Sequence, residues 1–476
     1  MQIQQLQRNA LTGFDSTLIA VSSASPANGF ATNTLPLVVA VGMSGPGSLI
    51  FGAIPMFGIA LAYFYLNSWR SDAGAAYSWV GRTINPTLGF LSGWSLLVAI
   101  VLFMVVGSLP LGSTTLHLFA PKYETSVLAV TGVGLVWFVI VVAIVLLGIK
   151  ATAEVQKTLT LIQIGGLIVF IGFAFTKGFA NPVNHLGWSW FGPVGNHGLQ
   201  SFWEGALVSI FYFWGWDISS NLTEETKNRN RVPGVSGIAG MVIILALFVM
   251  SQTAVQLIMS PQAIAAASSN LLVAFVDAAM PKQWDFVGYV VILIATIAVL
   301  EVSLVQGART MFSMGRDRVL DERFAYLNSR YLTPWNATIV LSAVTIALFA
   351  LAATSTSVNQ ILNDTIKAIA VMIAIYYGLS GFACARYYRE SNRVEKGMWW
   401  LRCAWPVASA LFVFVVAAWQ LAIAGFRSDA AVIGLLLLGF VPMFLYRRHY
   451  KSSYYTEAME YERTVDIKST ATQPST

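Results

Sequence analysis

Residues 209–233 read SIFYFWGWDISSNLTEETKNRNRVP. The stretch begins as an apolar helix, which a Trp-Gly-Trp triplet at residues 214–216 interrupts directly before Asp217. In hydrocarbon, a broken helix beside a carboxylate is tolerated only where protein, a ligand or water takes up the freed hydrogen bonds. The stretch therefore predicts a functional site if the chain lies in a membrane. A kinked helix in a soluble core is the alternative.

The composition of the whole chain decides between these two interpretations. Hydrophobic residues make up 56% of the 476 residues, charged residues make up 11%, and the mean hydropathy is +0.67. An average soluble domain is about 25% charged. At about 20 apolar residues per spanning helix, there is room for about twelve spans and no large soluble domain. The sequence therefore predicts an all-α integral membrane protein with one membrane domain.

Several other classes are excluded or unsupported. The net charge of +6 does not indicate nucleic acid, because the basic residues lie between hydrophobic segments rather than in one patch. Cys384 and Cys403, the only cysteines, have no metal-ligand spacing, so neither a disulfide framework nor a metal site is expected. The sequence indicates no cofactor. The first residues have no signal-peptide pattern, so we expect the first apolar segment to stay in the protein.

The apolar segments give an order of spans. We expect spans at residues 11–43, 49–66, 88–111, 127–147, 158–175, 199–222, 235–259, 287–314, 335–353, 366–385, 404–424 and 430–445. The first span is interrupted by SSASPANG at residues 22–29, where Pro26 lacks a backbone donor and disfavours helix in the preceding residue. Residues 1–10 would be an amino-terminal tail, 11–445 the transmembrane domain, and 446–476 a polar, disordered carboxyl-terminal tail.

The basic residues predict the orientation. All but five of the 28 lysines and arginines fall in segments on the same side as the amino terminus. The five on the other side are Lys122, Lys177, Lys282, Lys367 and Arg427. Because cytoplasmic loops carry the excess of positive charge, both termini are expected in the cytoplasm and the protein in the cell membrane, with an even number of crossings.

The two interrupted segments are spans one and six. That spacing is what two five-helix repeats of opposite orientation would give, here at about residues 11–177 and 199–385, with two further spans at 404–445. In transporters of this kind, substrate and coupling ion bind near the bilayer midplane between the two discontinuous helices. The repeat is inferred from segment order.

Three stretches carry a family resemblance over nearly the whole chain. They are DAGAAYSWVGRTINPTLGFLSGW at residues 72–94, FYFWGWDISSNLTEETKNRNRVP at 211–233, and GARTMFSMGRDRVLDERF at 307–324. In this order they resemble the amino acid, polyamine and organocation (APC) permease family. Bacterial putrescine and polyamine importers look closest around INPTLGF and MGRDR.

The resemblance implies a LeuT-type fold, secondary transport, and a pocket lined by the unwound parts of spans one and six. The implied pocket residues are Ser23, Ala24, Ser25, Pro26, Ala27, Gly29, Phe213, Trp214, Gly215, Trp216, Asp217 and Ser219. Two departures matter. SASPANG replaces the glycine-small-glycine motif that cradles a substrate carboxylate in many members. Gln163 stands where many proton-coupled members have a lysine, which leaves the coupling ion open.

The buried acids have competing roles. Asp217 could pair with a substrate ammonium, carry the coupled proton, or cap the restarted half-helix. Glu301, in the middle of the eighth span, could carry the proton, or could be structural, protonated and satisfied by Ser303, Gln306 or a neighbouring helix.

Other polar and aromatic residues also admit two interpretations. Trp214 and Trp216 could gate the pocket or stack on an amine, or could simply pack. Glu224, Glu225 and residues 316–318 could form an inner gate of ion pairs or a solvated rim.

The leading functional hypothesis is a secondary active transporter that imports an amino acid or a polyamine-type amine, coupled to protons. An exchanger of amino acid against amine is one alternative, and a membrane sensor with the permease fold is another. An enzyme is not supported, because no nucleophile, base and orienting group can be assembled from the motifs. The expected partners are the small-molecule substrate, the coupling ion and the lipid bilayer. Substrate identity, symport against exchange, and oligomeric state stay open.

Overall fold

The computed structural model describes residues 5–195, 198–267, 271–355, 357–390, 398–424 and 426–455. The long helices are α3 Gly45–Trp69, α5 Pro86–Phe119, α6 Val127–Leu146, α7 Ile149–Ala180, α10 Val232–Ile258, α13 Asp285–Arg316, α14 Trp335–Ala352, α15 Val358–Glu390 and α16 Trp405–Ala424. The shorter ones are α1 Gly13–Ala24, α2 Pro26–Val41, α4 Ala76–Thr83, α8 Leu199–Tyr212, α9 Ile218–Asn221, α11 Pro261–Ala267, α12 Leu271–Ala279, α17 Phe426–Leu438 and α18 Phe440–Tyr450.

Single turns connect these helices. They are 3₁₀ turns at Gly42–Ser44, Pro121–Tyr123, Trp188–Phe191, Thr223–Glu225, Lys282–Trp284, Glu322–Ala325 and Ser453–Tyr455, and a π-helical turn at Trp400–Ala404.

Local sequence explains where two of the helices begin. Thr12 and Asp15 form a capping box at the start of α1, in which each side chain bonds the other residue's backbone amide. Asn85 caps α5 by accepting from the amide of Thr87, and Pro86 occupies the first helical position, where its missing donor costs nothing.

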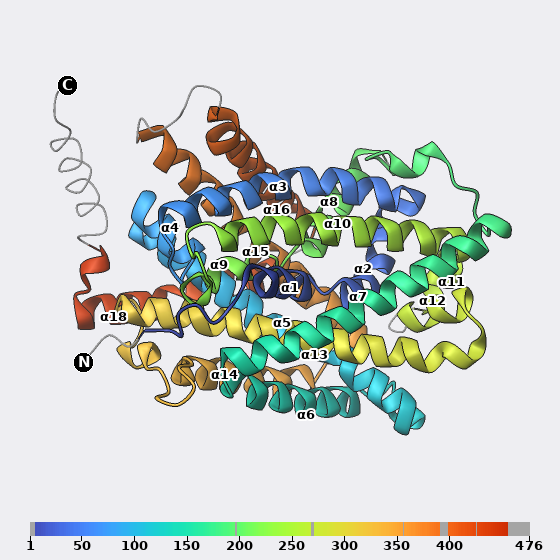
Figure 1. Cartoon of the computed structure of the whole chain (residues 1–476), viewed down its shortest axis with the longest axis horizontal. Coiled ribbons are helices and arrows are strands. Elements are labelled where there is room, and N and C mark those ends of the chain that lie inside the picture. Colours follow the sequence, from blue (N-terminus) through green and yellow to red (C-terminus); the bar gives the residue numbers. More distant parts are fainter. Residues whose placement is uncertain are drawn as a thin grey trace.

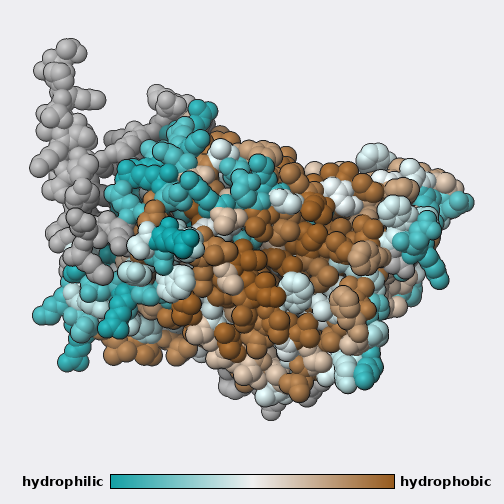
Figure 2. Space-filling view, turned by 60° about the horizontal axis from the view of Figure 1, so that its bottom comes forward, coloured by the Kyte–Doolittle hydropathy of each residue, from teal (hydrophilic) through white to brown (hydrophobic). Residues whose placement is uncertain are grey.

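The long helices lie side by side along the long axis of the molecule (Figure 1). Helix α1 lies inside the bundle, in contact with α7, α10 and α13. On one face, a broad hydrophobic band separates hydrophilic residues at the two ends (Figure 2). The predicted all-helical membrane protein is confirmed at this level.

The lengths of the helices bear on the number of membrane crossings. Ten helical stretches of the described residues are long and apolar enough to cross a membrane. One of them, Gly13–Trp69, is 57 residues long, which is more than one crossing needs. Helices α8 and α9, with 14 and 4 residues, are too short to qualify. Twelve spans, the inverted repeat and the LeuT-type fold therefore stay predictions.

The expected disorder from residue 446 onward is wrong for residues 446–455. Helix α18 continues to Tyr450, and a left-handed Lys451, with a φ of 46°, turns the chain back toward the bundle. The side chain of Tyr454 is only 5% exposed. An aromatic ring that packs against the bundle overrides the polar composition of this segment. Residues 456–476 lie outside the described part of the chain.

Both ends of the described chain lie at one end of the bundle. The amide of Leu11 donates to the carbonyl oxygen of Glu225 at 3.0 Å, and the amide of Lys227 donates to the carbonyl oxygen of Leu11 at 2.9 Å. This backbone ladder joins the start of α1 to the segment after α9. At the same end, Ser452 Oγ donates to the backbone oxygen of Asp317. Both termini on one side agrees with an even number of crossings.

Candidate functional site

The first interruption is a single residue. Ser25, with φ 45° and ψ 75°, separates α1 from α2. Its hydroxyl lies 3.1 Å from the carbonyl oxygen of Ala295 in α13 and 3.2 Å from Oε1 of Gln163 in α7. Gln163 thus contacts the interruption at the position where the resemblance placed a lysine in other members.

The unwound stretch predicted in span one is too wide. Ser23 and Ala24 are helical residues of α1, and Pro26, Ala27 and Gly29 belong to α2. The reason is that proline suits the first turn of a helix, where its missing donor would be unpaired anyway. A proline here starts the second half-helix rather than prolonging the interruption.

The second interruption spans residues 213–217, between α8 and α9. Gly215 has a φ of 109°, and a Cβ added to it would lie 2.7 Å from the carbonyl oxygen of Ser23. A side chain is therefore excluded here by both conformation and space. Ser219, predicted to be unwound, is helical and donates to the carbonyl oxygen of Trp216. The two predicted stretches lie in direct contact at Ser23 and Gly215.

Asp217 is buried, with 1% of its surface exposed, and it stands at the N-cap position of α9, but its side chain makes no capping hydrogen bond. Its carboxylate accepts from the hydroxyl of Tyr377 in α15 and from Nε2 of Gln306 in α13, both at 2.8 Å. The interpretation that its side chain bonds the free amides of α9 is therefore wrong. Tyr377 could not be singled out from the sequence, because a tyrosine in an apolar span has no distinguishing pattern.

Aromatic rings surround Asp217. Trp216 stacks on Tyr377, with ring centroids 5.7 Å apart, and contacts Tyr63 of α3 edge-on at 5.3 Å. Trp214 donates its indole N–H to the hydroxyl of Tyr376 at 2.6 Å. Within the described residues, the indole N–H of the buried Trp216 has no hydrogen-bond partner. A buried unpaired donor is uncommon, and this one is available to a ligand beside Asp217.

Glu301 belongs to a separate polar group. Gln156 of α7 donates Nε2 to Glu301 Oε2 at 2.5 Å and to the carbonyl oxygen of Ala298 at 2.9 Å, and it accepts from Ser22 of α1 at 2.6 Å. Ser303 and Gln306, the expected partners on the same helix, bond elsewhere. A neighbouring helix supplies the partner instead.

Ion pairs close the end of the bundle where both chain ends lie. Arg309 pairs with Glu225 through two hydrogen bonds of 3.0 Å, with side chains 1% and 0% exposed. Arg316 pairs with Glu224 at 2.9 Å and with Asp72 at 3.1 Å, and Arg82 pairs with Asp317 at 3.0 Å. We call these four pairs the ionic cluster; its members are Asp72, Arg82, Glu224, Glu225, Arg309, Arg316 and Asp317.

The solvated-rim interpretation is wrong for these residues and fits only Arg318, whose side chain is 61% exposed. Burial raises the pKa of the Asp72 carboxyl, but the guanidinium groups of Arg316, Arg82 and Arg70 outweigh burial and hold that pKa well below its usual range. Asp72 therefore stays ionised, and its ion pairs intact, at physiological pH.

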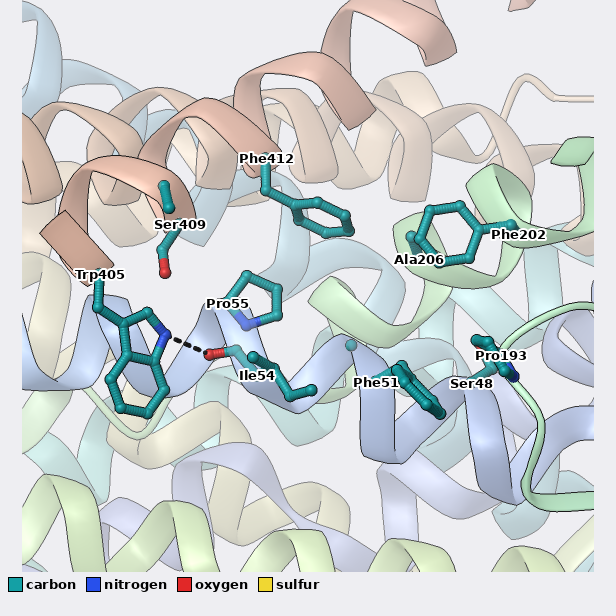
Figure 3. A pocket seen from close by; sticks show the side chains of 12 residues that line it. Ser48, Phe51, Ile54, Pro55, Pro193, Phe202, Ala206, Trp405, Ser409 and Phe412 are labelled. Atoms are coloured by element: carbon teal, nitrogen blue, oxygen red, sulfur yellow. Dashed lines mark hydrogen bonds between the residues drawn. The ribbon is translucent and has the colours of Figure 1, made fainter.

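A cavity of about 280 Å³ lies at the perimeter, between α3, α8 and α16. Figure 3 shows Phe51, Phe202 and Phe412 around it, with the indole of Trp405 donating to the carbonyl oxygen of Ile54. Its lining includes no charged side chain. It offers no carboxylate to pair with an ammonium group, so the surroundings of Asp217 are the better candidate site.

A family model described as "Amino acid permease" matches residues 11–441. The chain belongs to this family. The match covers both interruptions, the ionic cluster and the helices that carry Asp217 and Glu301. It confirms the resemblance drawn from the three sequence stretches.

Curated relatives of the permease have diverse names. The branched-chain amino acid permease of Lactococcus lactis is 27% identical over 344 residues, which are 66% of this chain and 70% of the relative. The low-affinity putrescine importer of Escherichia coli is 26% identical over 319 residues, 63% of this chain and 65% of the relative. The methylthioribose transporter of Bacillus subtilis is 25% identical over 346 residues, 69% and 72% of the two chains. These relatives are transporters rather than enzymes.

Proposed function

We propose that the permease is a secondary transporter that imports an amino acid or a polyamine-type amine into the cell, with Asp217 as the partner of the substrate ammonium. The position of Asp217 carries this proposal. Its two hydrogen-bond donors, Tyr377 and Gln306, are both neutral. A buried carboxylate with no cation beside it is costly, and a substrate ammonium would supply the missing charge.

The rings around Asp217 support an amine as the ligand. Trp216 and Tyr63 pack in one aromatic group with Tyr377, whose hydroxyl bonds Asp217, and a cation over an aromatic face is attracted by the ring quadrupole. Two of the similar proteins are named for putrescine and for branched-chain amino acids, and both kinds of molecule carry amino groups.

We further propose that Glu301 carries the coupled proton. One carboxyl oxygen of Glu301 bonds Gln156, while the other has no hydrogen-bond partner among the described residues. Because Gln156 also bonds Ser22 of α1, gain or loss of a proton at Glu301 would change a contact three residues before the first interruption at Ser25.

Uptake into proteoliposomes tests both roles. Uptake of radiolabelled putrescine, arginine and leucine is measured in three conditions: without a pH gradient, with an acidic exterior, and with an alkaline exterior. We expect accumulation of at least one of them, driven by an acidic exterior. Asp217→Asn should weaken binding of the transported substrate by roughly 10- to 100-fold, as loss of a charged partner implies.

Glu301→Gln mimics the protonated acid, so it should retain binding and exchange but lose uphill uptake. Glu154→Gln, an exposed position on α7, is the matched control. If Glu301→Gln accumulates substrate with normal dependence on pH, Glu301 is structural. If Asp217→Asn binds the substrate with unchanged affinity, the ammonium site lies elsewhere.

A further inference from the structure

The segment after α18 folds back onto the bundle through one tyrosine. Lys451 reverses the chain, and Ser452 and Tyr454 are both buried. The ring of Tyr454 stacks on Tyr77 of α4, with centroids 5.2 Å apart and planes 17° apart, and the guanidinium carbon of Arg82 lies 5.5 Å from the ring centroid. Helices α4 and α18 lie at the same end of the molecule (Figure 1).

The place that Tyr454 occupies is made by two glycines. Its hydroxyl lies over Gly81 of α4 and Gly89 of α5, so close that a Cβ on either residue would overlap the hydroxyl oxygen. The same hydroxyl donates to the carbonyl oxygen of Tyr77 at 3.4 Å. We call this place the tyrosine socket, made by Tyr77, Gly81, Arg82 and Gly89.

The tyrosine socket is continuous with the ionic cluster. The hydroxyl of Tyr77 and the guanidinium of Arg82 both donate to one carboxylate oxygen of Asp317, at 3.0 Å each. Ser452 donates to the backbone oxygen of the same Asp317 at 2.5 Å. Residues 452–455 therefore hold α4 and the end of α13 together. These two elements must separate if the ion pair between Arg82 and Asp317 is to open.

We propose that residues 452–455 are an intramolecular ligand of the tyrosine socket, which stabilises the closed state of the ionic cluster and must leave before this end of the permease opens. The contact is made by four residues, 452–455, that follow the end of α18. Short terminal segments of this kind detach with a smaller free-energy cost than elements of the core. The inference goes beyond the proposed transport function and does not depend on which substrate is carried.

A cysteine reporter tests the proposal without a substrate. Ser220 of α9 is buried and its hydroxyl has no hydrogen-bond partner within the described residues, so Ser220→Cys is a mild change. The background carries Cys384→Ala and Cys403→Ala. The rate at which an impermeant maleimide labels residue 220 then reports how often the ionic end opens. It is measured in both inside-out and right-side-out vesicles, so that a reversed orientation appears as labelling from the other side.

Tyr454→Ala should raise the labelling rate roughly tenfold, as loss of a buried, stacked ring implies. Gly81→Ala should raise the labelling rate to the same degree, because the added methyl group would displace the Tyr454 ring from the tyrosine socket. Because both changes empty one contact, the double variant should match either single variant. Tyr450→Ala, which removes a ring that stacks on Tyr446 within α18, is the matched control and should not change the rate.

Tyr454→Phe keeps the stacked ring and should label close to the parent rate. A change in labelling for Tyr454→Ala but not for Tyr454→Phe would therefore be due to loss of the ring contact. Thermal unfolding of each variant checks that the protein is folded. Unchanged labelling of folded Tyr454→Ala and Gly81→Ala, or full additivity of their effects, would overturn the proposal. Faster labelling of Tyr450→Ala to the same degree would show general loosening of α18 instead, which also contradicts it.

Discussion

Among the residues of the candidate site, Gly215 is a position where only glycine fits. Its positive φ and the carbonyl oxygen of Ser23, 2.7 Å from where a Cβ would stand, leave no room for a side chain. The contact is between two backbones, one from each interrupted segment. A side chain here would push the segments apart next to Asp217.

Gly215→Leu should therefore abolish uptake and binding of the transported substrate while the protein stays folded in detergent. Gly215→Ala should show an intermediate loss, because a single methyl needs a smaller shift. Gly172→Leu is the matched control, since a Cβ at Gly172 of α7 meets no atom within 4 Å. Binding is measured by scintillation proximity and folding by size-exclusion chromatography. Normal affinity in Gly215→Leu would place the site away from the two interruptions.

At the scale of helices, α1, α7 and α13 are joined by a few polar side chains in an apolar interior. Gln156 alone bonds Ser22, Ala298 and Glu301 on the two neighbouring helices. Its removal would leave several buried polar groups unpaired, and each such group costs about 1–3 kcal/mol. Gln163, about two helical turns further along α7, has the hydroxyl of Ser25 as its partner.

Gln156→Leu should lower the thermal unfolding midpoint clearly more than Gln163→Leu, since it leaves more partners unpaired. A maleimide dye that reacts with Cys384 and Cys403 as they become accessible can follow unfolding, because both thiols are buried in the folded chain. Equal shifts for the two variants would mean that the Gln156 bonds contribute little to stability.

The same helices show how far the sequence could lead. The breaks that Pro26 and the Trp-Gly-Trp triplet predict lie next to the boundaries between α1 and α2 and between α8 and α9, because proline and glycine act on the local backbone. Tyr63 and Tyr377 could not be found, since an aromatic residue in an apolar span looks the same whether it packs on lipid or beside Asp217. Gln156 was missed because the fifth span was expected to begin at residue 158, two residues after it, whereas α7 begins at Ile149.

At the scale of the whole molecule, the distribution of charge and the position of the chain ends agree. Leu11 and Ser452 lie at the same end as the ionic cluster, which contains residues of three predicted inner segments. The predicted outer loops with Lys122 and Lys282 follow the other ends of α5 and α12. The excess of basic residues predicts that the ionic end faces the cytoplasm.

Cysteine labelling in intact cells checks this orientation. Lys122→Cys and Lys282→Cys, both at exposed positions, should react with an impermeant maleimide from outside. Arg318→Cys, also exposed, should react only after the cells are permeabilised. The buried Cys384 and Cys403 should give little background. Labelling of Arg318→Cys in intact cells would reject the predicted topology.

The backbone ladder between Leu11 and the residues after α9 has a mechanical consequence. Its two hydrogen bonds, to Glu225 and from Lys227, involve no side chain. The start of α1 is thus hydrogen-bonded to the segment that follows α9. We expect these two parts of the chain to move together as one rigid unit during a transport cycle. Because both hydrogen bonds are between backbone groups, most substitutions at these positions leave them in place. We therefore expect that side-chain changes around Asp217 can alter substrate preference while this backbone connection stays the same.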